Sequence, residues 1–524
     1  MRTPATRLLI LLLALPGCRG LEPYPVPAHD TESEIAAETE AHAEAEAEMA
    51  PDAEAEMAEM AEMAPDAAAE PESEAEAPAG NSSWSRGFGG QRHDQGSSIA
   101  VDHEGNVLVA GHFSSASIDF DGDELTNASD DNDIFVIKLD AAGELLWSRT
   151  FGGTGDDRCH ALAVDREGKV TLAGYFVSPS IDLGGGVLVN QGRGGDAFVL
   201  ALDADGSHRW SRRFGVEDWD RAEDLAVDGD GNLFFTGSSY SAGIDFGGGS
   251  HDSPDPVYAD IFLVKLDAEG GHLWSRVYAG TDNDFAHALA LDRDGNIFIT
   301  GNHWSSDLDF GGGSISKAGS RNFDMFLAKL DPQGGHRWSR AFGGGDREFG
   351  KSLAVDHRNN ILVTGWFGSP GIDFGGGIIE NVRGRDAFLV AFDPQGEHLW
   401  SRGFTGDGFD DQGFSVAVGA NGRVLLTGAF VEGYESNIDF GGGPLACGGG
   451  SDAFLAVFEG NGAHAWSRSF GGENAEIGFD VATGAGGFLY LTGSHCSPDV
   501  EFVGETLDNH GFADIFVVKL DQPH

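Results

Sequence analysis

The stretch Trp147-Ser-Arg-Thr-Phe-Gly-Gly153 decides the fold, because its first three residues recur throughout the chain. Trp-Ser-Arg occurs seven times, at spacings of 63, 63, 64, 64, 62 and 66 residues, beginning at Trp84, Trp147, Trp210, Trp274, Trp338, Trp400 and Trp466. A period of this length predicts one supersecondary unit that is copied and packed against its own neighbours.

The repeating unit is clearest between Asp133 and Asp196. It contains four short runs rich in β-branched and aromatic residues, at 133–140, 145–151, 161–165 and 170–176. Gly/Asp turns separate the runs, none has helical periodicity, and a longer Gly-rich loop follows the last, so we expect four strands per copy. The runs are almost continuously apolar, so both faces of each small sheet must be buried. Sheets stacked around an axis meet that requirement.

The two ends of the repeat region are incomplete in complementary ways. Residues 81–88 contain only the strand that carries Trp-Ser-Arg, and residues 514–521 contain the strand that elsewhere precedes it. Pairing them would remove an exposed sheet edge. We therefore predict an all-β protein over residues 81–524, a seven-bladed β-propeller of four-stranded blades in which the N-terminal strand completes the last blade.

The motifs resemble a known family. The pattern Trp-Ser-Arg-x-Phe-Gly-Gly, then Ala-Val-Asp-x-x-Gly-Asn, then Thr-Gly-x-Phe is similar to the bacterial β-propeller repeat called SBBP, over roughly residues 81–521. The resemblance implies the propeller fold and a secreted or surface location in bacteria. It implies no particular chemistry.

The first 80 residues are expected to lie outside the propeller. Residues 1–18 have the layout of a signal peptide, and Leu15-Pro16-Gly17-Cys18 resembles a lipoprotein lipobox, with Cys18 as the lipid anchor. An ordinary secretory signal is the alternative. Residues 19–80 are rich in Ala, Glu and Pro, and 21–80 hold 19 Asp/Glu without Lys or Arg, which predicts a disordered tether, or alternatively an acidic partner-binding arm.

These features predict a lipid-anchored protein of the bacterial cell envelope, with a monomeric propeller in the periplasm or on the cell surface. The residue after the anchor is Arg19 and not an Asp, which would act as a retention signal. The sequence therefore favours the outer membrane. The formal net charge of −53 argues against nucleic acid as a partner, since backbone binding requires clustered Lys and Arg. A protein or a neutral glycan is compatible with this negative charge as a ligand.

A carboxylate stands eight residues before the end of each Ala-Val-Asp-type strand, in all seven copies: Asp94, Asp157, Asp220, Asp284, Glu348, Asp411 and Glu476. This set would surround one mouth of the central channel. Oxygen ligands suit Ca²⁺, so a cation ring is one interpretation. The preferred interpretation is structural, namely that each carboxylate accepts N–H bonds from its Gly-Gly loop. No other metal or cofactor is expected.

Three cysteines remain within the propeller. Cys447 and Cys496 follow the second strands of adjacent copies, so a disulfide between them is predicted as one option, which would leave Cys159 as a buried thiol. No Cys-x-x-Cys spacing supports zinc or redox chemistry.

Two functional classes remain open. Residues that depart from the repeat are His160, His287, His303, Trp219, Tyr240, Trp304 and Trp366, and either ligand binding or packing between blades explains them. No known catalytic motif is present, so no catalytic residue is assigned. We therefore favour a non-catalytic binding or scaffold platform. The alternative is a carbohydrate-active hydrolase or lyase that uses the channel-mouth carboxylates.

Overall fold

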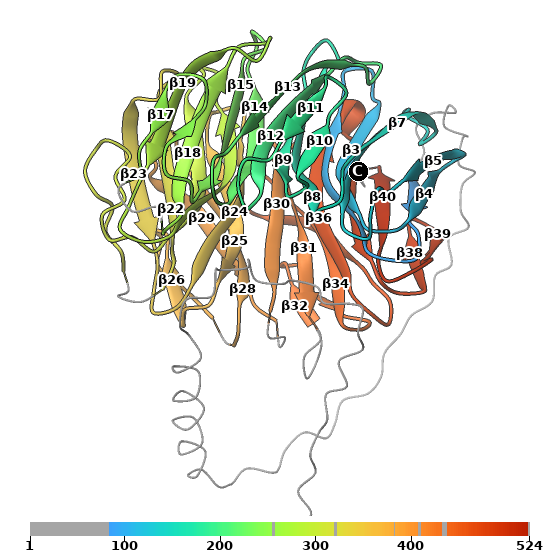
Figure 1. Cartoon of the computed structure of the whole chain (residues 1–524). Helices are drawn as coiled ribbons and strands as arrows, with labels where there is room; N and C mark the ends of the chain where they lie inside the picture. The colour runs from blue at the N-terminus through green and yellow to red at the C-terminus, as the bar shows by residue number, and fades with distance from the viewer. Residues whose placement is uncertain are drawn as a thin grey trace, which may run out of the picture. The chain divides into compact units, whose positions relative to one another are not determined.

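The fold is seen in a computed structural model, which describes residues 83–253, 257–318, 322–381, 383–406, 410–431 and 437–521. The predicted signal peptide, Cys18 and the tether lie outside these residues. The described residues form seven four-stranded antiparallel sheets, and neighbouring sheets follow one another around a ring (Figure 1). The prediction of an all-β, seven-bladed propeller is confirmed.

Each blade runs from the axis outward through four strands. The innermost strands, from blade 1 to blade 7, are β2 (Asp94–Val101), β8 (Asp157–Val164), β14 (Asp220–Val227), β20 (Asp284–Leu291), β24 (Glu348–Val355), β30 (Gln412–Val418) and β36 (Glu476–Thr483). The second strands are β3 (Val107–Phe113), β9 (Val170–Phe176), β15 (Leu233–Ser239), β21 (Ile297–His303), β25 (Ile361–Phe367), β31 (Val424–Val431) and β37 (Leu489–His495). Each innermost strand contacts those of the two adjacent blades, so the seven enclose the axis.

The outer half of each blade carries the repeated motif. The third strands are β6 (Asp133–Leu139), β12 (Asp196–Leu202), β18 (Asp260–Leu266), β22 (Asp324–Leu330), β28 (Asp386–Phe392), β34 (Ser451–Phe458) and β40 (Asp514–Leu520). The outermost strands, which contain Trp-Ser-Arg, are β7 (Leu145–Phe151), β13 (His208–Phe214), β19 (His272–Tyr278), β23 (His336–Phe342), β29 (His398–Phe404), β35 (His464–Phe470) and β1 (Trp84–Phe88).

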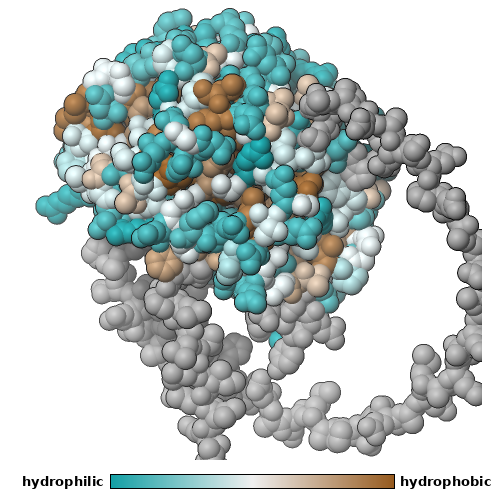
Figure 2. Space-filling view, turned by 90° about the vertical axis from the view of Figure 1, so that its right-hand side faces the viewer, coloured by the Kyte–Doolittle hydropathy of each residue, from teal (hydrophilic) through white to brown (hydrophobic). Residues whose placement is uncertain are grey.

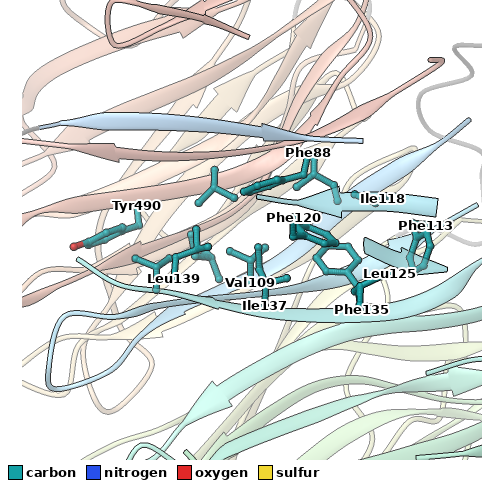
Figure 3. Close-up of a cluster of buried hydrophobic side chains, with 14 of the residues drawn as sticks. Phe88, Val109, Phe113, Ile118, Phe120, Leu125, Phe135, Ile137, Leu139 and Tyr490 are labelled. Atoms are coloured by element: carbon teal, nitrogen blue, oxygen red, sulfur yellow. The ribbon is translucent and has the colours of Figure 1, made fainter. Parts of the chain in front are cut away.

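The ring closes as predicted, within blade 7. Strand β1 pairs antiparallel with β40, from Trp84 opposite Lys519 to Phe88 opposite Ile515. Phe88 then packs with Phe120 of blade 1, at 4.9 Å between ring centroids, in a buried cluster that both blades share (Figure 3). The two ends of the propeller are therefore joined by backbone pairing and by apolar burial.

The Gly-rich loop between the second and third strands is not irregular, contrary to expectation. In six blades it forms a two-stranded hairpin: β4 (Ser117–Phe120) with β5 (Asp123–Thr126), β10 (Ser180–Asp182) with β11 (Val187–Val189), β16 (Ile244–Asp245) with β17 (Ser250–His251), β26 (Gly371–Asp373) with β27 (Ile378–Glu380), β32 (Asn437–Asp439) with β33 (Pro444–Ala446), and β38 (Asp499–Phe502) with β39 (Glu505–Asp508).

The turn chemistry of these hairpins explains the Gly-Gly-Gly sequence. Asp182 Oδ1 accepts hydrogen bonds from the N–H groups of Gly184 and Gly186, at 2.9 and 3.0 Å, and both glycines have positive φ. Ile181 is almost fully buried, which anchors the hairpin on the blade. In the described residues the only helix is the 3₁₀ turn η1 (Ala485–Gly487), so none is long enough to span a membrane.

A β-bulge in each innermost strand shapes the region around the axis. In blade 2 the pairing of β8 with β9 shifts between Cys159 and Ala161, so His160 is the extra residue. A Cβ placed on Gly174 of β9 would lie 2.0 Å from the carbonyl oxygen of Arg158, so only glycine allows this close approach. The equivalent glycine of the Thr-Gly or Ala-Gly motif recurs in every blade, which keeps seven bulges in register.

At five of the seven boundaries between blades, the tryptophan of the repeat binds one blade to the next. The indole Nε1 of Trp147 in blade 1 donates to Ala204 O in blade 2 at 3.1 Å, and Arg149 Nε donates to Gly206 O at 3.1 Å. Equivalent indole bonds join Trp84 to Ala141, Trp210 to Ala268, Trp338 to Pro394 and Trp400 to Gly460. We call this end of the blades, where these hairpin turns lie, the turn face.

Among the described residues, two of the seven motif tryptophans, Trp274 and Trp466, show no such indole bond. Trp466 Nε1 is buried and has no hydrogen-bond partner among the described residues. The position that corresponds to Ala204 falls at Gln522, beyond the described chain. Within the described part of the chain, the interface between blades 6 and 7 therefore shows no indole bond.

This difference predicts unequal effects of one substitution. Trp147→Phe keeps an aromatic ring but removes the indole donor, so it should lower the free energy of unfolding by about 1 kcal/mol. Trp466→Phe loses no described hydrogen bond and should cost clearly less. Urea unfolding followed by circular dichroism gives both free energies. Equal losses of free energy in the two variants would contradict a stabilising role of the Trp147 indole bond.

Candidate functional site

The seven carboxylates singled out from the sequence lie at the start of the innermost strands, on what we call the loop face, opposite the turn face. They are buried, at 0 or 1% exposure. In blade 2, Asp157 accepts hydrogen bonds from Gly153 N at 2.9 Å and Ser178 Oγ at 2.6 Å. Six of the seven have a serine in the position of Ser178: Ser115, Ser178, Ser241, Ser305, Ser369 and Ser497.

The bonds from the glycines cross a blade boundary, whereas Ser178 lies in the same blade as Asp157. Gly153 follows the outermost strand of blade 1, whereas Asp157 begins the innermost strand of blade 2. Gly90 N donates to Asp94 in the same way at 2.8 Å, and Gly472 N donates to Glu476 at 2.7 Å. The carboxylates therefore hold the connections between blades at the loop face, as the tryptophans hold them at the turn face.

A second buried aspartate faces each of these carboxylates from the preceding blade. A Cβ on Gly215 would lie 2.3 Å from Asp196 Oδ1 and 2.8 Å from Asp220 Oδ2, so this glycine stands between the two carboxyl groups. Burial, and then the charge of Asp196, raise the pKa of Asp220 to about 7. Burial likewise raises the pKa of Asp284, Glu348 and Asp411 to about 7 and of Asp94 to about 6.

The arrangement leaves these carboxylates little access to a ligand from solvent. Among the described residues, no group of three or more His, Cys, Asp or Glu side chains has the geometry to hold a metal ion. A cation ring at the seven positions stays a prediction from the sequence.

The bulges place a different set of residues around the axis. The extra residue of each innermost strand is, from blade 1 to blade 7, Ser97, His160, Glu223, His287, Lys351, Phe414 and Phe479. We call this set the bulge ring. Sequence reasoning found His160 and His287 as departures from the repeat but not the ring, because a one-residue bulge leaves no trace in an apolar pattern.

One half of the bulge ring is polar and its members interact. His160 Nδ1 lies 3.1 Å from Glu223 Oε2, and His287 Nε2 lies 2.5 Å from Asn302 Oδ1. Burial alone would raise the pKa of Glu223, but His160 and the other nearby cationic groups lower it to about 2. Burial lowers the pKa of Lys351 to about 8 and that of His287 to about 3.

Planar side chains surround the polar half on the loop face. Phe349 stacks on Trp366 at 4.3 Å, and the Arg385 guanidinium lies 4.5 Å from the Trp366 ring centre. Arg221 lies 4.4 Å from the Trp219 ring centre and 5.1 Å from that of Tyr175. Trp219 and Trp366 thus pack with cations, as cation–π pairs do.

The remaining candidates lie farther out. Trp304 packs edge-on against Phe323 at 4.8 Å, and Tyr240 packs near Phe285 at 6.4 Å. His303 is fully buried, its Nδ1 lies 2.9 Å from Ser305 O, and burial lowers its pKa to about 4. These contacts fit packing between neighbouring strands.

A cavity of about 250 Å³ lies elsewhere, at the turn face between blades 2 and 3, beside Asp165, Ala201, Trp210 and Asp228. Ala201 occupies the position of Lys138 in blade 1, whose ammonium bonds Asp102 at 2.9 Å and reaches the next blade. The absence of a lysine at position 201 explains this cavity. We therefore prefer the bulge ring as the candidate binding site, because unlike functional groups converge there.

The cysteines do not form a reactive cluster. Cys159 is fully buried, and burial raises the pKa of its thiol to about 12. The Cys447 thiol lies 3.1 Å from Gly449 O and 3.5 Å from Asp452 Oδ1, and no disulfide joins it to Cys496 in this structure. The disulfide stays a prediction from the sequence.

On the face shown in Figure 2, the described residues form no large apolar patch. The face shown in Figure 2 is mainly hydrophilic, and its hydrophobic residues form separate groups. The most exposed apolar side chains include Val187 and Ile378 on the hairpins and Leu146 on an outermost strand. Single exposed apolar residues of this kind are ordinary on protein surfaces.

The chain is similar to one known repeat family and to proteins of several organisms. Residues 273–309 match the SBBP β-propeller repeat, a stretch that runs from β19 to the start of the Gly-rich loop of blade 4. A WD repeat-containing protein of Acanthamoeba polyphaga mimivirus is 23% identical over 426 residues, covering 65% of this chain and 30% of that protein. The regulatory protein FlaEY of Caulobacter vibrioides is 25% identical over 407 residues, covering 71% and 39%. The chain thus spans less than half the length of these relatives.

Solved structures give only distant matches. The WD40 domain of Neurospora crassa Pan2 has a TM-score of 0.38 at 11% identity, covering 82% of this chain and 90% of that one. A catalytically inactive virginiamycin B lyase from Staphylococcus aureus has a TM-score of 0.38 at 8% identity, covering 84% and 100%. We draw no function from likenesses of this size. The repeat match and the fold together support a propeller built from SBBP-type repeats.

The raised pKa of the buried carboxylates predicts a pH-dependent effect. A carboxyl group with a folded-state pKa near 7 stabilises the fold at low pH, and this contribution is lost as pH rises through 7. Asp220→Asn resembles the protonated acid, so its melting temperature relative to the parent chain should increase between pH 5 and pH 8. Differential scanning calorimetry at several pH values measures this difference.

Asp245→Asn is the matched control. Asp245 lies in an exposed hairpin turn, where the N–H groups of Gly247 and Gly249 lower its pKa, so it stays ionised from pH 5 to 8. Its effect on melting temperature should not change with pH. A pH-independent effect of Asp220→Asn would show that Asp220 is ionised throughout.

Proposed function

We propose that the protein is a lipid-anchored component of the bacterial cell envelope, whose propeller serves as a non-catalytic binding platform. The acyl groups on Cys18 would hold it in a membrane, with the outer membrane preferred. The acidic segment 19–80 would act as the tether that carries the propeller. The lipobox-like sequence at Leu15–Cys18 supports the anchor, and the repeat match supports the family context.

One observation carries the binding role, namely the contrast between constant and variable positions. The carboxylates, the bulge glycines and the motif tryptophans are the same, or chemically alike, in all seven blades. The bulge ring, by contrast, holds five different residue types in seven copies. Structural duties repeat in every blade, whereas recognition of one ligand requires unlike groups around it. The recognition surface of the platform is therefore the bulge ring, in the middle of the innermost strands.

An enzyme that uses the channel-mouth carboxylates is less favoured. Asp94, Asp157 and their equivalents are buried and accept several hydrogen bonds each, so they cannot reach a polysaccharide without breaking the loop connections. A general acid or base must come within hydrogen-bond reach of its substrate. For the outer surface, a protein or a neutral glycan remains the expected partner, because the chain carries a strong negative charge.

The anchor is tested by replacing its cysteine. Cys18→Ser should abolish incorporation of labelled fatty acid and release the protein from the membrane fraction, because stable anchoring needs the acyl chains. Gly17→Ala, which keeps the cysteine and a small residue before it, should preserve both. Membrane retention of the Cys18→Ser protein without label would contradict lipid anchoring.

The platform is tested with full-length protein as bait in the native envelope. Phe414→Ser together with Phe479→Ser should remove a specific captured component that the parent chain retains, because both residues belong to the bulge ring. Arg358→Ser, an exposed turn-face change, should leave capture intact. If all three baits capture the same components, the bulge ring is not the recognition surface.

A further inference from the structure

The cavity between blades 2 and 3 lies where other blades hold a lysine side chain. In blade 1, Lys138 Nζ lies 2.9 Å from Asp102 Oδ2 and donates a hydrogen bond to Ala204 O of blade 2 at 3.4 Å. Equivalent ion pairs, at 3.5 and 3.4 Å, recur in blades 3 and 4: Lys265 with Asp228, and Lys329 with Asp292. Blade 2 has Ala201 at this position, and the cavity of about 250 Å³ lies beside it.

Asp165, the blade 2 equivalent of Asp102, lines this cavity. Its Oδ1 accepts hydrogen bonds from the N–H groups of Glu167 and Lys169, at 2.8 and 2.9 Å, whereas its Oδ2 has no partner among the described residues. In four other blades the corresponding Oδ2 accepts an asparagine amide at 2.8 or 2.9 Å: Asn106, Asn232, Asn296 and Asn360. Blade 2 has Lys169 in place of this asparagine, and the Lys169 ammonium lies 2.5 Å from Glu167 Oε2. Asp165 Oδ2 has therefore lost both of the partners that the repeat provides elsewhere.

The next blade supplies a second acceptor to the same cavity. Ala268 O of blade 3 accepts the indole bond of Trp210 at 2.9 Å, and both residues line the cavity. Equivalent carbonyl oxygens accept a lysine N–H as well as an indole N–H, at 2.8 to 3.4 Å: Ala204 O from Lys138 and Trp147, Pro394 O from Lys329 and Trp338, and Ala141 O from Lys519 and Trp84. A carbonyl oxygen has two lone pairs, so Ala268 O retains one for a further donor.

The walls and the opening of the cavity suit a short alkyl chain. Four apolar side chains line it: Val164, Val227, Leu233 and Trp210. Arg166, Glu167 and Asp230 also line the cavity and are exposed, so it opens to solvent at the turn face. Mainly apolar walls with a few polar groups at fixed places are typical of sites for small ligands.

The charges around the cavity favour a cation over an anion. Arg209 Nε on the wall lies 3.3 Å from Asp203 Oδ1, and the Lys169 ammonium is paired with Glu167, so both cations are compensated. The Asp165 carboxylate has no such ion pair among the described residues. An anion would face this carboxylate without a counterion, whereas an ammonium group would form a charge-assisted hydrogen bond with it.

We propose that this cavity binds a primary ammonium group on an unbranched alkyl chain. The ammonium takes the place of the missing lysine, donating to Asp165 Oδ2 in blade 2 and to Ala268 O in blade 3. The alkyl chain lies beside Ala201 and Val227. Free aliphatic diamines and the lysine side chain of a peptide share this chemistry. The site is separate from the bulge ring, so it does not depend on the function proposed for that ring.

The first experiment is isothermal titration calorimetry with the full chain in about 150 mM NaCl, which screens general attraction to the acidic surface. Butylammonium should bind at one site per chain, about tenfold more tightly than butanol or tetramethylammonium, because only butylammonium has both a charge and N–H donors. Equal binding of butylammonium and tetramethylammonium, or no binding at about 20 mM, overturns the proposal. Putrescine and Nα-acetyl-lysine amide are then compared, and the tighter ligand identifies a free diamine or a peptide lysine as the source.

The second experiment fills the cavity from within. Ala201→Lys should restore the lysine of the other blades, raise the melting temperature by about 2 °C and abolish butylammonium binding. Ala201→Met occupies similar space without an ammonium, so it should also block binding but raise the melting temperature less. Leu146→Lys adds the same charge on the exposed outermost strand of blade 1 and should leave binding unchanged. If Ala201→Lys binds butylammonium as the parent chain does, the proposal is wrong.

The third experiment tests the carboxylate. Asp165→Asn keeps the shape of the side chain and the acceptor for its turn, but removes the charge, so butylammonium binding should weaken about tenfold. Asp102→Asn is the matched control, because Lys138 already occupies the equivalent place in blade 1. It should leave binding unchanged. Unaltered binding to Asp165→Asn would overturn the assignment, and melting curves show that each variant remains folded.

Discussion

The structure depends on the burial of both faces of every blade. A four-stranded sheet with apolar side chains on both faces has no stable form alone, so each blade needs a neighbour on each side. Seven clusters of buried residues lie between successive blades, and each draws residues from two of them. Closure is therefore a requirement of the fold, and β1 meets it by completing blade 7.

Two polar devices set the spacing between blades at opposite ends. Tryptophans such as Trp147 bind hairpin turns at the turn face, and carboxylates such as Asp157 bind Gly-Gly loops at the loop face. Both devices form hydrogen bonds with backbone groups that would otherwise be buried without partners. Each device therefore satisfies these groups and also fixes the distance between neighbouring blades. The sequence repeats strongly because both devices recur from blade to blade. The bulge ring escapes this constraint, since its side chains face the axis and not a neighbouring blade's backbone.

The repeat made the fold predictable, including the number of blades and the pairing of the two ends. The repeat period and the incomplete units at the two ends can be recognised from the order of the residues alone. The positions of Trp84 and Asp514 show this. The hairpins β10–β11 and their equivalents were missed because strands of two or three residues among glycines have little strand propensity. The bulge ring was missed for a different reason. His160 and Lys351 become neighbours of the axis only through a register shift that Gly174 and its equivalents permit, and such a shift depends on three-dimensional pairing.

The closure through β1 and β40 also has a consequence for the order of assembly. Trp84 leaves the ribosome among the first residues of the propeller, but its partner Lys519 leaves among the last. During synthesis β1 has no strand to pair with, while the blades between can already form and stack. Bringing such distant segments together is slow, because few conformations of a long chain place its ends side by side. Strand β1 therefore stays without its partner until synthesis of the final strand is complete, so the ring can close only at the end of translation.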